Sequence, residues 1–165
     1  MAIMYSLKGE LQALDIENDY NVLNLGDCGE TGSTVVTFTA TDDCGSSETT
    51  SATLTVEDNT IPIVTVSPSD LSVECDGSGN ITDINTWLAN QGGAVANDDC
   101  SNVTWTNNFT TVSDDCGETG VATVTFTATD DCGNATTATA QIIIFDNEAP
   151  TITAAASDLT IPCDA

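Results

Sequence analysis

The stretch that decides the fold occurs twice in this chain. Residues 27–45 read DCGETGSTVVTFTATDDCG, and residues 115–133 read DCGETGVATVTFTATDDCG, 88 positions later. The same offset relates EDNTIP to FDNEAP further along, and 27 of the 51 positions aligned between 27–77 and 115–165 are identical without a gap. Self-similarity at a fixed period is the signature of tandem structural units. The sequence therefore predicts repeats of about 88 residues.

The period divides the chain into four parts. Residues 27–57 are expected to form the C-terminal part of one immunoglobulin-like repeat, and residues 58–145 a complete repeat. Residues 146–165 are expected to supply the first strand of the next repeat. Residues 1–26 fit the period poorly and are interpreted as an atypical or truncated start.

Alternating side chains in the repeated stretch indicate a half-buried β-strand. Val124, Phe126 and Ala128 alternate with threonines, so one face of the strand is apolar and the other polar. The following DDCGN, at residues 130–134, has the Asp, Gly and Asn content of a hairpin turn. Further strands are expected within residues 62–75, 103–109 and 141–145.

One short helix is expected inside the complete repeat. Ile84, Trp87 and Leu88 follow the i, i+3, i+4 spacing of an apolar helix face. Either Thr82 or Asp83 is expected to cap its start. Together these patterns predict an all-β fold of tandem immunoglobulin-like sandwiches with one short inserted helix.

The charge balance excludes several classes of partner. The chain has 26 acidic residues, a single base and no histidine, which gives a formal net charge of -25. Nucleic acids and anionic membrane surfaces are bound through Lys and Arg, so neither is an expected partner. Self-repulsion of this size favours divalent cations as counterions. The alternative is a solvated acidic surface that only maintains solubility.

The seven cysteines indicate disulfides rather than zinc, because the chain has neither histidine nor a CxxC pair. Disulfides in turn indicate an oxidising, extracellular compartment. If 103–109 and 121–129 run antiparallel, Cys100 and Cys132 lie at the same end of the sandwich, and Cys75 and Cys116 at the opposite end. The hypothesis is a pair of bridges, Cys100–Cys132 and Cys75–Cys116, among three possible pairings. The remaining cysteines are expected to need partners in the atypical start or outside this sequence: Cys28, Cys44 and Cys163.

Paired acids beside the cysteines suggest a calcium site. Calcium takes six to eight oxygen ligands, and loops with two adjacent aspartates supply them. In the predicted topology, several acidic loops share the end of the sandwich at which the linker from the preceding unit arrives. The alternative is that Asp and Gly in these loops only form turns and caps. The calcium ligands predicted at this junction are Glu30, Asp58, Asn59, Asp98, Asp99, Asp130 and Asp131.

The motifs VTFTATDDCGN and DN-x-x-P resemble the hyalin-repeat type of immunoglobulin-like module. Together with WLANQGG at 87–93 and VTWTNNF at 103–109, they are similar to the repeats of SprB-like gliding-motility adhesins of Bacteroidetes. The resemblance covers residues 27–165. It implies secretion, display on an outer-membrane-attached surface filament, and a role in adhesion or gliding motility. The DN-x-x-P linker also resembles cadherin junctions, where Asp and Asn bind calcium.

An enzyme is disfavoured because the chain has no histidine to act as a base near neutral pH and no nucleophile in an activating motif. The expected partners are neighbouring repeats and, further, surface polysaccharide or other surface proteins, without membrane insertion. The alternative function is a carbohydrate-binding module, which needs an exposed aromatic platform. Trp87 and Trp105 are both expected to be packed instead, and an exposed Trp105 would favour the alternative. The pattern does not separate a passive spacer from a directly adhesive repeat.

Overall fold

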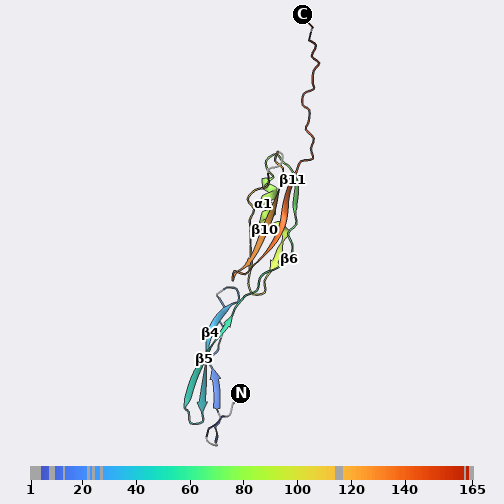
Figure 1. Ribbon diagram of the computed structural model, residues 1–165. Helices are drawn as coiled ribbons and strands as arrows, with labels where there is room; N and C mark the ends of the chain where they lie inside the picture. Colours follow the sequence, from blue (N-terminus) through green and yellow to red (C-terminus); the bar gives the residue numbers. More distant parts are fainter. Residues whose placement is uncertain are drawn as a thin grey trace.

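The computed structural model describes residues 5–7, 10–12, 14–21, 23, 25–26, 28–113, 117–161 and 163. The described chain is elongated, with two β-rich parts arranged end to end and a C-terminal tail that leads away from them (Figure 1). Its elements confirm an all-β fold with one short α-helix. In chain order they are β1 Tyr5–Leu7, β2 Glu10–Gln12, β3 Leu14–Asn18, β4 Gly32–Asp42, β5 Ser47–Val56, β6 Ile63–Val66, β7 Leu71–Glu74, α1 Ile81–Ala89, the 3₁₀ helix η1 Gln91–Gly93, β8 Val95–Asn97, β9 Val103–Asn107, β10 Gly120–Asp130 and β11 Ala135–Phe145.

The larger part, residues 58–145, is built on a four-stranded sheet with the order β7-β11-β10-β9. We call this part the complete unit. β10 pairs antiparallel with β9 and with β11, while β7 joins the outer edge of β11 in parallel. The predicted alternation along β10 is confirmed, because Val124, Phe126 and Ala128 are fully buried. Their face of the sheet forms the centre of the core, with Ile142 and Ile144 from β11.

α1 packs on this apolar face. Ile84 is buried within the core cluster, and Trp87 and Leu88 pack against it. The Trp87 ring meets the Phe126 ring edge-on, with centroids 5.1 Å apart. The predicted helix is therefore confirmed, but its cap is Asn80 rather than Thr82 or Asp83. Asn80 takes this position because its side-chain amide donates a 2.9 Å hydrogen bond to the carbonyl of Glu74, which ties the start of α1 to the end of β7.

The opening segment of the complete unit forms two strands in different sheets. β6 pairs antiparallel with β8 in a separate two-stranded sheet, with an irregularity between Val64 and Val66. β7 instead belongs to the four-stranded sheet, where Cys75 extends the pairing by donating from its backbone N–H to Phe145. Ser69 and Asp70 lie between the two strands, and the Ser69 carbonyl accepts a 2.8 Å hydrogen bond from the Trp87 indole.

The smaller part, residues 14–57, is a three-stranded sheet with the order β3-β4-β5. We call it the first unit. The β4–β5 register repeats that of β10–β11 with the 88-residue offset: Gly32 lies opposite Val56, as Gly120 lies opposite Ile144. β3 corresponds to β9 with a one-residue slip, because Asn18 lies opposite Phe38. A separate hairpin, β1–β2, precedes it.

The residues just after β3 and just after β9 make the same side-chain contact. After β3, the carboxylate of Asp19 accepts a hydrogen bond of 2.7 Å from the backbone of Thr37. After β9, the side chain of Asn108 accepts one of 2.8 Å from the backbone of Thr125. Asp and Asn thus serve interchangeably here, because each offers an oxygen acceptor at the same point.

Beyond β11, the described residues 146–161 contain no strand or helix and are exposed throughout. The predicted strand of a following repeat therefore has no sheet partner within the described part of the chain. The described helices are nine and three residues long, well short of the roughly 20 residues that cross a bilayer.

Candidate functional site

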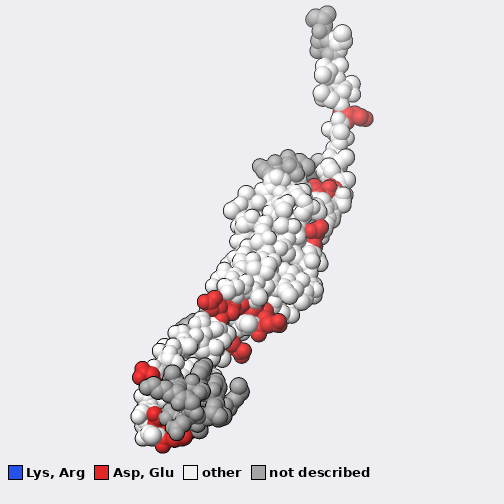
Figure 2. Space-filling view, turned by 60° about the horizontal axis from the view of Figure 1, so that its bottom comes forward, with Lys and Arg blue, Asp and Glu red and all other residues white. Residues whose placement is uncertain are grey.

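The loops that carry the cysteines and paired acids meet where the first unit joins the complete unit. We define the junction as residues 28–31 of the first unit, the linker residue Asp58, the loop 98–101, and the turn 131–134. Acidic side chains gather at the narrow part of the molecule between the two units (Figure 2). The sequence analysis predicted such a convergence of acidic loops at one end of the unit.

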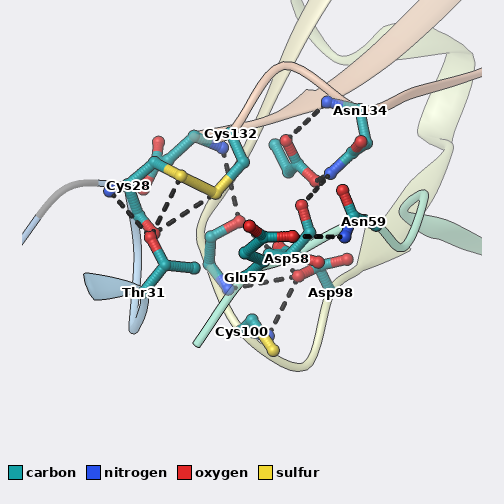
Figure 3. The surroundings of a disulfide bond; sticks show 12 residues. Cys28, Thr31, Glu57, Asp58, Asn59, Asp98, Cys100, Cys132 and Asn134 are labelled. Atoms are coloured by element: carbon teal, nitrogen blue, oxygen red, sulfur yellow. Dashed lines mark hydrogen bonds between the residues drawn. A yellow bond between two sulfur atoms is a disulfide. The ribbon is translucent and has the colours of Figure 1, made fainter. Parts of the chain in front are cut away.

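A disulfide crosses the junction. Cys28 of the first unit is bonded to Cys132 of the complete unit, 104 residues away (Figure 3). The predicted Cys100–Cys132 bridge is therefore wrong, and Cys100 has no disulfide partner among the described residues. The prediction is wrong because the partner of Cys132 lies in the preceding unit, whose loop at Cys28 reaches the same turn.

The other predicted bridge involves a residue outside the described part of the chain. Cys116 is not described, so the Cys75–Cys116 pairing stays a prediction. Cys75 itself is half-buried and has no disulfide partner among the described residues.

The loop that carries Cys28 approaches the complete unit closely because of a glycine. Gly29 has a φ of +58°, in the left-handed region, and a Cβ at this position would lie 2.5 Å from the carbonyl oxygen of Cys100. The next residue, Glu30, donates its backbone N–H to that same carbonyl at 2.9 Å. A residue with a side chain at 29 would hold the two loops apart.

Thr31 shapes the same loop from within. Its hydroxyl donates to the Cys28 carbonyl at 2.7 Å and accepts from the Cys28 backbone N–H at 3.1 Å. Thr31 is itself buried. The backbone that carries the Cys28 sulfur is therefore held by Thr31 as well as by the disulfide.

Asp58 lies at the centre of the junction and is only 8% exposed. One carboxylate oxygen, Oδ1, accepts from the backbone N–H and the hydroxyl of Thr60 at 3.0 and 2.7 Å. Its backbone carbonyl accepts from the side chain of Asn134 at 3.1 Å. The second carboxylate oxygen, Oδ2, is buried without a hydrogen-bond partner among the described residues. A buried anionic oxygen without a partner is costly.

Asp98 and Cys100 face this unpartnered carboxylate. One ligand atom from each of Asp58, Asp98 and Cys100 can be chosen so that all three lie within 4.8 Å of one another. Asp98 is held in place by its own loop, because its Oδ1 accepts from the backbone of Cys100 at 2.9 Å and of Ser101 at 3.1 Å. Two carboxylates therefore converge beside a thiol.

The negative charge at this point acts on the Cys100 thiol. Burial is the main cause that raises the pKa of Cys100, and the nearby carboxylates of Asp58, Asp98, Asp99 and Glu30 raise it further. These acids come from the first unit, the linker and the complete unit. The thiol therefore stays protonated at neutral pH.

Two more predicted ligands line a neighbouring depression. Glu30 and Asp99 border a pocket of about 390 Å³, together with Asp98 and Cys100 of the cluster. The pocket is therefore bordered by acids from both sides of the junction. Of the seven predicted calcium ligands, Asp58 and Asp98 therefore belong to the cluster itself, and Glu30 and Asp99 adjoin it.

The remaining three predicted ligands are engaged elsewhere. Asn59 donates from its side chain to Glu57 at 3.4 Å, and Asp131 accepts from the backbone and the side chain of Asn102, both at 3.4 Å. Asp130 is buried, and its two carboxylate oxygens accept from the backbone and the side chain of Asn134, both at 2.8 Å.

The pKa of Asp130 reflects this environment. Desolvation acts to raise the pKa, but the hydrogen bonds from the Asn134 side chain and from the backbone of Asn134, Gly133 and Cys132 outweigh it and lower the pKa overall. Asp130 is therefore an ionised acid that holds the turn carrying Cys132. This is the turn-forming role that the sequence analysis kept as the alternative to calcium binding.

Sequence reasoning missed two features of the junction. The partner of Cys28 was expected in the atypical start or outside this sequence, whereas Cys28 is bonded to Cys132. Asn134 was noticed only as a turn residue, although its side chain joins Asp58 of the linker to Asp130. The available signal was the hairpin predicted after Cys28: Gly32 pairs with Val56, so the loop before the first strand lies beside the linker that follows the second strand.

No protein-family model matches this chain, and no curated protein matches it either.

Proposed function

We propose that this chain is a structural and adhesive repeat of a large secreted filament protein at the cell surface, without catalytic activity. In this proposal its units are tandem immunoglobulin-like sandwiches of about 88 residues, similar to the repeats of gliding-motility adhesins. The observation that carries the proposal is the junction: copies of one repeated motif lie end to end, and a disulfide joins loops of successive units. Such a bridge limits bending between units, which suits a filament that must extend and bear load.

The closeness of the loops supports a stiff connection. Glu30 bonds to Cys100, Asn134 bonds to the linker at Asp58, and the bridge adds a covalent link. These three contacts come from different segments, so rotation about the linker breaks at least one of them. The disulfide is also compatible with an extracellular location.

We further propose that calcium binds at the junction and completes the connection. The unpartnered Oδ2 of Asp58 needs a positively charged partner, and the chain's only basic residue lies in the atypical start. A divalent cation between Asp58 and Asp98 would offset both the buried charge and the repulsion between the two carboxylates. Glu30 and Asp99 supply further carboxylates at the adjoining pocket.

Calcium fits these donors better than zinc does. Zinc sites in proteins are made mainly from thiolates and imidazoles, and this chain has no histidine. Burial and the surrounding acids raise the pKa of the Cys100 thiol, and two of the three side chains of the cluster, Asp58 and Asp98, offer carboxylate oxygens. Oxygen ligands are those that calcium prefers.

Calorimetric titration of calcium into the full chain tests this site. We expect Asp58→Asn and Asp98→Asn each to weaken calcium binding by roughly tenfold or more, because each removes a charged ligand. Asparagine retains an oxygen acceptor, so the local turns are preserved. The matched control is Asp43→Asn, which removes the same charge from an exposed hairpin turn of the first unit.

The variant Cys100→Ser distinguishes a calcium site from a zinc site. Calcium binding is expected to survive this substitution, whereas a zinc site would lose its sulfur ligand. Calcium binding that is equal in wild type, Asp58→Asn and Asp98→Asn would refute the site. This result would not contradict the proposal that the two units form a rod joined by the disulfide.

The rod itself is tested by small-angle X-ray scattering of the full chain. The maximum dimension is expected to match the extended arrangement of Figure 1 and to show little bending. The double variant Cys28→Ser/Cys132→Ser is expected to bend more, and more strongly when calcium is chelated. A wild-type profile typical of two freely jointed units would contradict the proposal.

The carbohydrate-binding alternative gains no support from the tryptophans. Trp87 and Trp105 are half-buried and pack against the core of the complete unit. A glycan array probed with the full chain distinguishes a directly adhesive repeat from a spacer, because only the former retains glycans.

A further inference from the structure

Two covalent connections join the first unit to the complete unit. One is the chain itself, whose linker runs from the end of β5 at Val56 to the start of β6 at Ile63. The other is the Cys28–Cys132 bridge (Figure 3). The bridge encloses residues 29–131, which contain every element from β4 to β10. The shortest covalent route along the protein therefore leaves all of these elements out.

The bridge delivers tension to the start of β11. Cys132 lies in the turn between β10 and β11, and β11 ends at Phe145, where the chain leaves the complete unit (Figure 1). A pull that enters at Cys132 and leaves after Phe145 acts on the two ends of one strand. A β-strand already rises about 3.3 Å per residue, against a maximum of roughly 3.6 Å for a stretched chain. Tension along β11 therefore gains almost no length, and force that gains no length does little work.

β11 is also held firmly on both edges. β10 pairs with it at ten positions, and β7 pairs with it at four positions on the other edge. Ile142 and Ile144 of β11 are buried in the core cluster of the complete unit. The strand can leave the sheet only if both ladders and these core contacts break together.

The linker by itself would load the complete unit in a different way. It would pull on Ile63 at the start of β6, which pairs with β8 at three positions with an irregularity among them. β7 follows β6 in the chain and is joined to β11 by four paired positions. A pull between Ile63 and Phe145 would peel these strands away one after the other. Each detached residue adds length, so this pull unfolds the unit.

The bridge keeps the linker from being stretched. It fixes the loop of the first unit to the turn at Cys132, and the backbone N–H of Glu30 bonds to the carbonyl of Cys100 beside it. The linker is held at the same place, because the Asp58 carbonyl accepts from the side chain of Asn134. Separation of the two units therefore strains the bridge before it strains β6.

We propose that the Cys28–Cys132 bridge is a mechanical bypass: tension along the protein passes from Cys28 to Cys132 and on through β11, while residues 29–131 stay folded without carrying it. The use of such a bypass rests on the proposed function, because a filament that holds a cell to a surface is pulled along its length. The mechanical property itself follows from the connectivity of the bridge and needs no calcium.

Reduction switches the bypass off. A dithiol reductant breaks the Sγ–Sγ bond and supplies two electrons and two protons, so that two cysteine thiols form and the reductant closes to a cyclic disulfide. Tension then passes through residues 29–131, and their unfolding adds roughly 350 Å of chain. The oxidised protein is therefore expected to resist extension, whereas the reduced protein is expected to extend by unfolding.

Single-molecule force spectroscopy of the full chain, tethered by peptide tags at its two ends, tests the proposal. Oxidised wild type is expected to show no unfolding step at forces that unfold the complete unit of Cys28→Ser/Cys132→Ser. The fully extended double variant is expected to be longer than wild type by roughly 350 Å. Peptide mapping without reduction checks that wild type carries the bridge, and tryptophan fluorescence checks that the double variant is folded.

The matched control is Cys44→Ser/Cys163→Ser, which removes two exposed cysteines that lie outside the bridge. It is expected to extend like wild type. If the Cys28→Ser/Cys132→Ser chain does not fold, a dithiol added to a wild-type molecule held under tension replaces it. The wild-type molecule is then expected to lengthen by roughly 350 Å after the bridge is cleaved.

A weakened core shows whether the enclosed residues carry tension. Leu71 of β7 packs against the core cluster, so Leu71→Ala is expected to lower the force that unfolds the Cys28→Ser/Cys132→Ser chain. In the oxidised chain with its bridge intact, Leu71→Ala is expected to leave the response to force unchanged, because tension does not reach β7.

Three results would overturn the bypass: unfolding of oxidised wild type at the same force as the double variant, a lower unfolding force for Leu71→Ala in the oxidised chain, and absence of the bridge from the peptide map. The first two would leave the proposed rod standing, because its straightness is measured separately by scattering. Conversely, freely jointed units in scattering, together with the expected response to force, would contradict the rod and leave the bypass intact.

Discussion

The β4–β5 and β10–β11 hairpins share a sequence pattern and a register but differ in their surroundings. Phe126 in the complete unit is fully buried, whereas its counterpart Phe38 in the first unit is 38% exposed. The difference arises because α1 and β7 cover the second hairpin. Neither cover has an equivalent over the first hairpin within the described residues. Strand pairing is thus a local property of the repeated motif, whereas its burial depends on segments elsewhere in the chain.

The two hairpins are expected to differ most when their matching phenylalanines are replaced by alanine. Phe126→Ala is expected to destabilise the complete unit by about 3–5 kcal/mol, because it opens a cavity in a packed core and removes the Trp87 contact. Phe38→Ala is expected to cost about 1 kcal/mol or less, because its site is already half open to water.

Urea unfolding followed by tryptophan fluorescence measures this difference. Both tryptophans of the chain, Trp87 and Trp105, lie in the complete unit, so the signal reports that unit alone. The Phe38→Ala midpoint is expected to match that of wild type. Equal shifts for the two variants would show that loss of the Phe38 side chain destabilises the complete unit as much as loss of the Phe126 side chain, which would contradict the separate environments of the two hairpins.

A smaller effect is expected from the paired glycines at the start of the two hairpins. Gly29 and Gly117 have φ values of +58° and +62°, so alanine at either position costs about 1–2 kcal/mol for the left-handed backbone. Only Gly29 lies against other atoms, the carbonyl of Cys100 and the side chain of Ser101. Gly29→Ala is therefore expected to destabilise the junction by an additional amount of at least about 1 kcal/mol.

The melting temperatures and the rate at which a reductant cleaves Cys28–Cys132 provide the measurement. Gly29→Ala should lower the melting temperature more than Gly117→Ala and should expose the bridge to faster reduction. If the two variants behave identically, the loops of the two units do not touch in solution.

The smallest expected effect is on the pH dependence of stability, and it comes from the aspartates of the two hairpin turns, Asp130 and Asp42. The pKa of Asp130 is lowered in the folded chain, so its contribution to stability is fully present above the pKa of the unfolded chain, near 3.9. That contribution is lost as the pH falls through the lower folded pKa. Asp130→Asn should therefore destabilise the complete unit at pH 6, and its difference from wild type should shrink as the pH approaches 2.

Asp42→Asn is the matched control for this experiment. Asp42 occupies the equivalent turn, but its hydrogen bonds from Cys44 and Ser46 use only one carboxylate oxygen. Asp42 lies in the first unit and both tryptophans lie in the complete unit, so its substitution should leave the pH profile of the tryptophan signal unchanged. If the difference in stability between Asp130→Asn and wild type stays constant from pH 6 to pH 2, the role assigned to the Asp130 carboxylate is contradicted.

Part of the junction was predictable from the sequence. Adjacent aspartates in two loops, at 98–99 and 130–131, predicted an acidic end of the unit beside the linker, and two of the predicted ligands, Asp58 and Asp98, do lie together. The engagement of Asp130 with Asn134 was not predictable in the same way, because a turn-forming Asp and a metal-binding Asp have the same local sequence. Only the positions of neighbouring donors separate the two roles.

The repeated strand, the turn that follows it and the single helix were predictable from the sequence, since alternation, turn residues and i, i+3, i+4 spacing all act within about 20 residues of one another. The strand β8 and the division of β6 and β7 between two sheets were not predicted. The tertiary structure was needed to show that Cys28 meets Cys132 and that one oxygen of Asp58 is buried without a partner among the described residues. It alone also decided that one of two matching hairpins is covered and the other is not. These outcomes depend on contacts between segments 40 to 104 residues apart, and a local pattern does not specify which distant segments pack together.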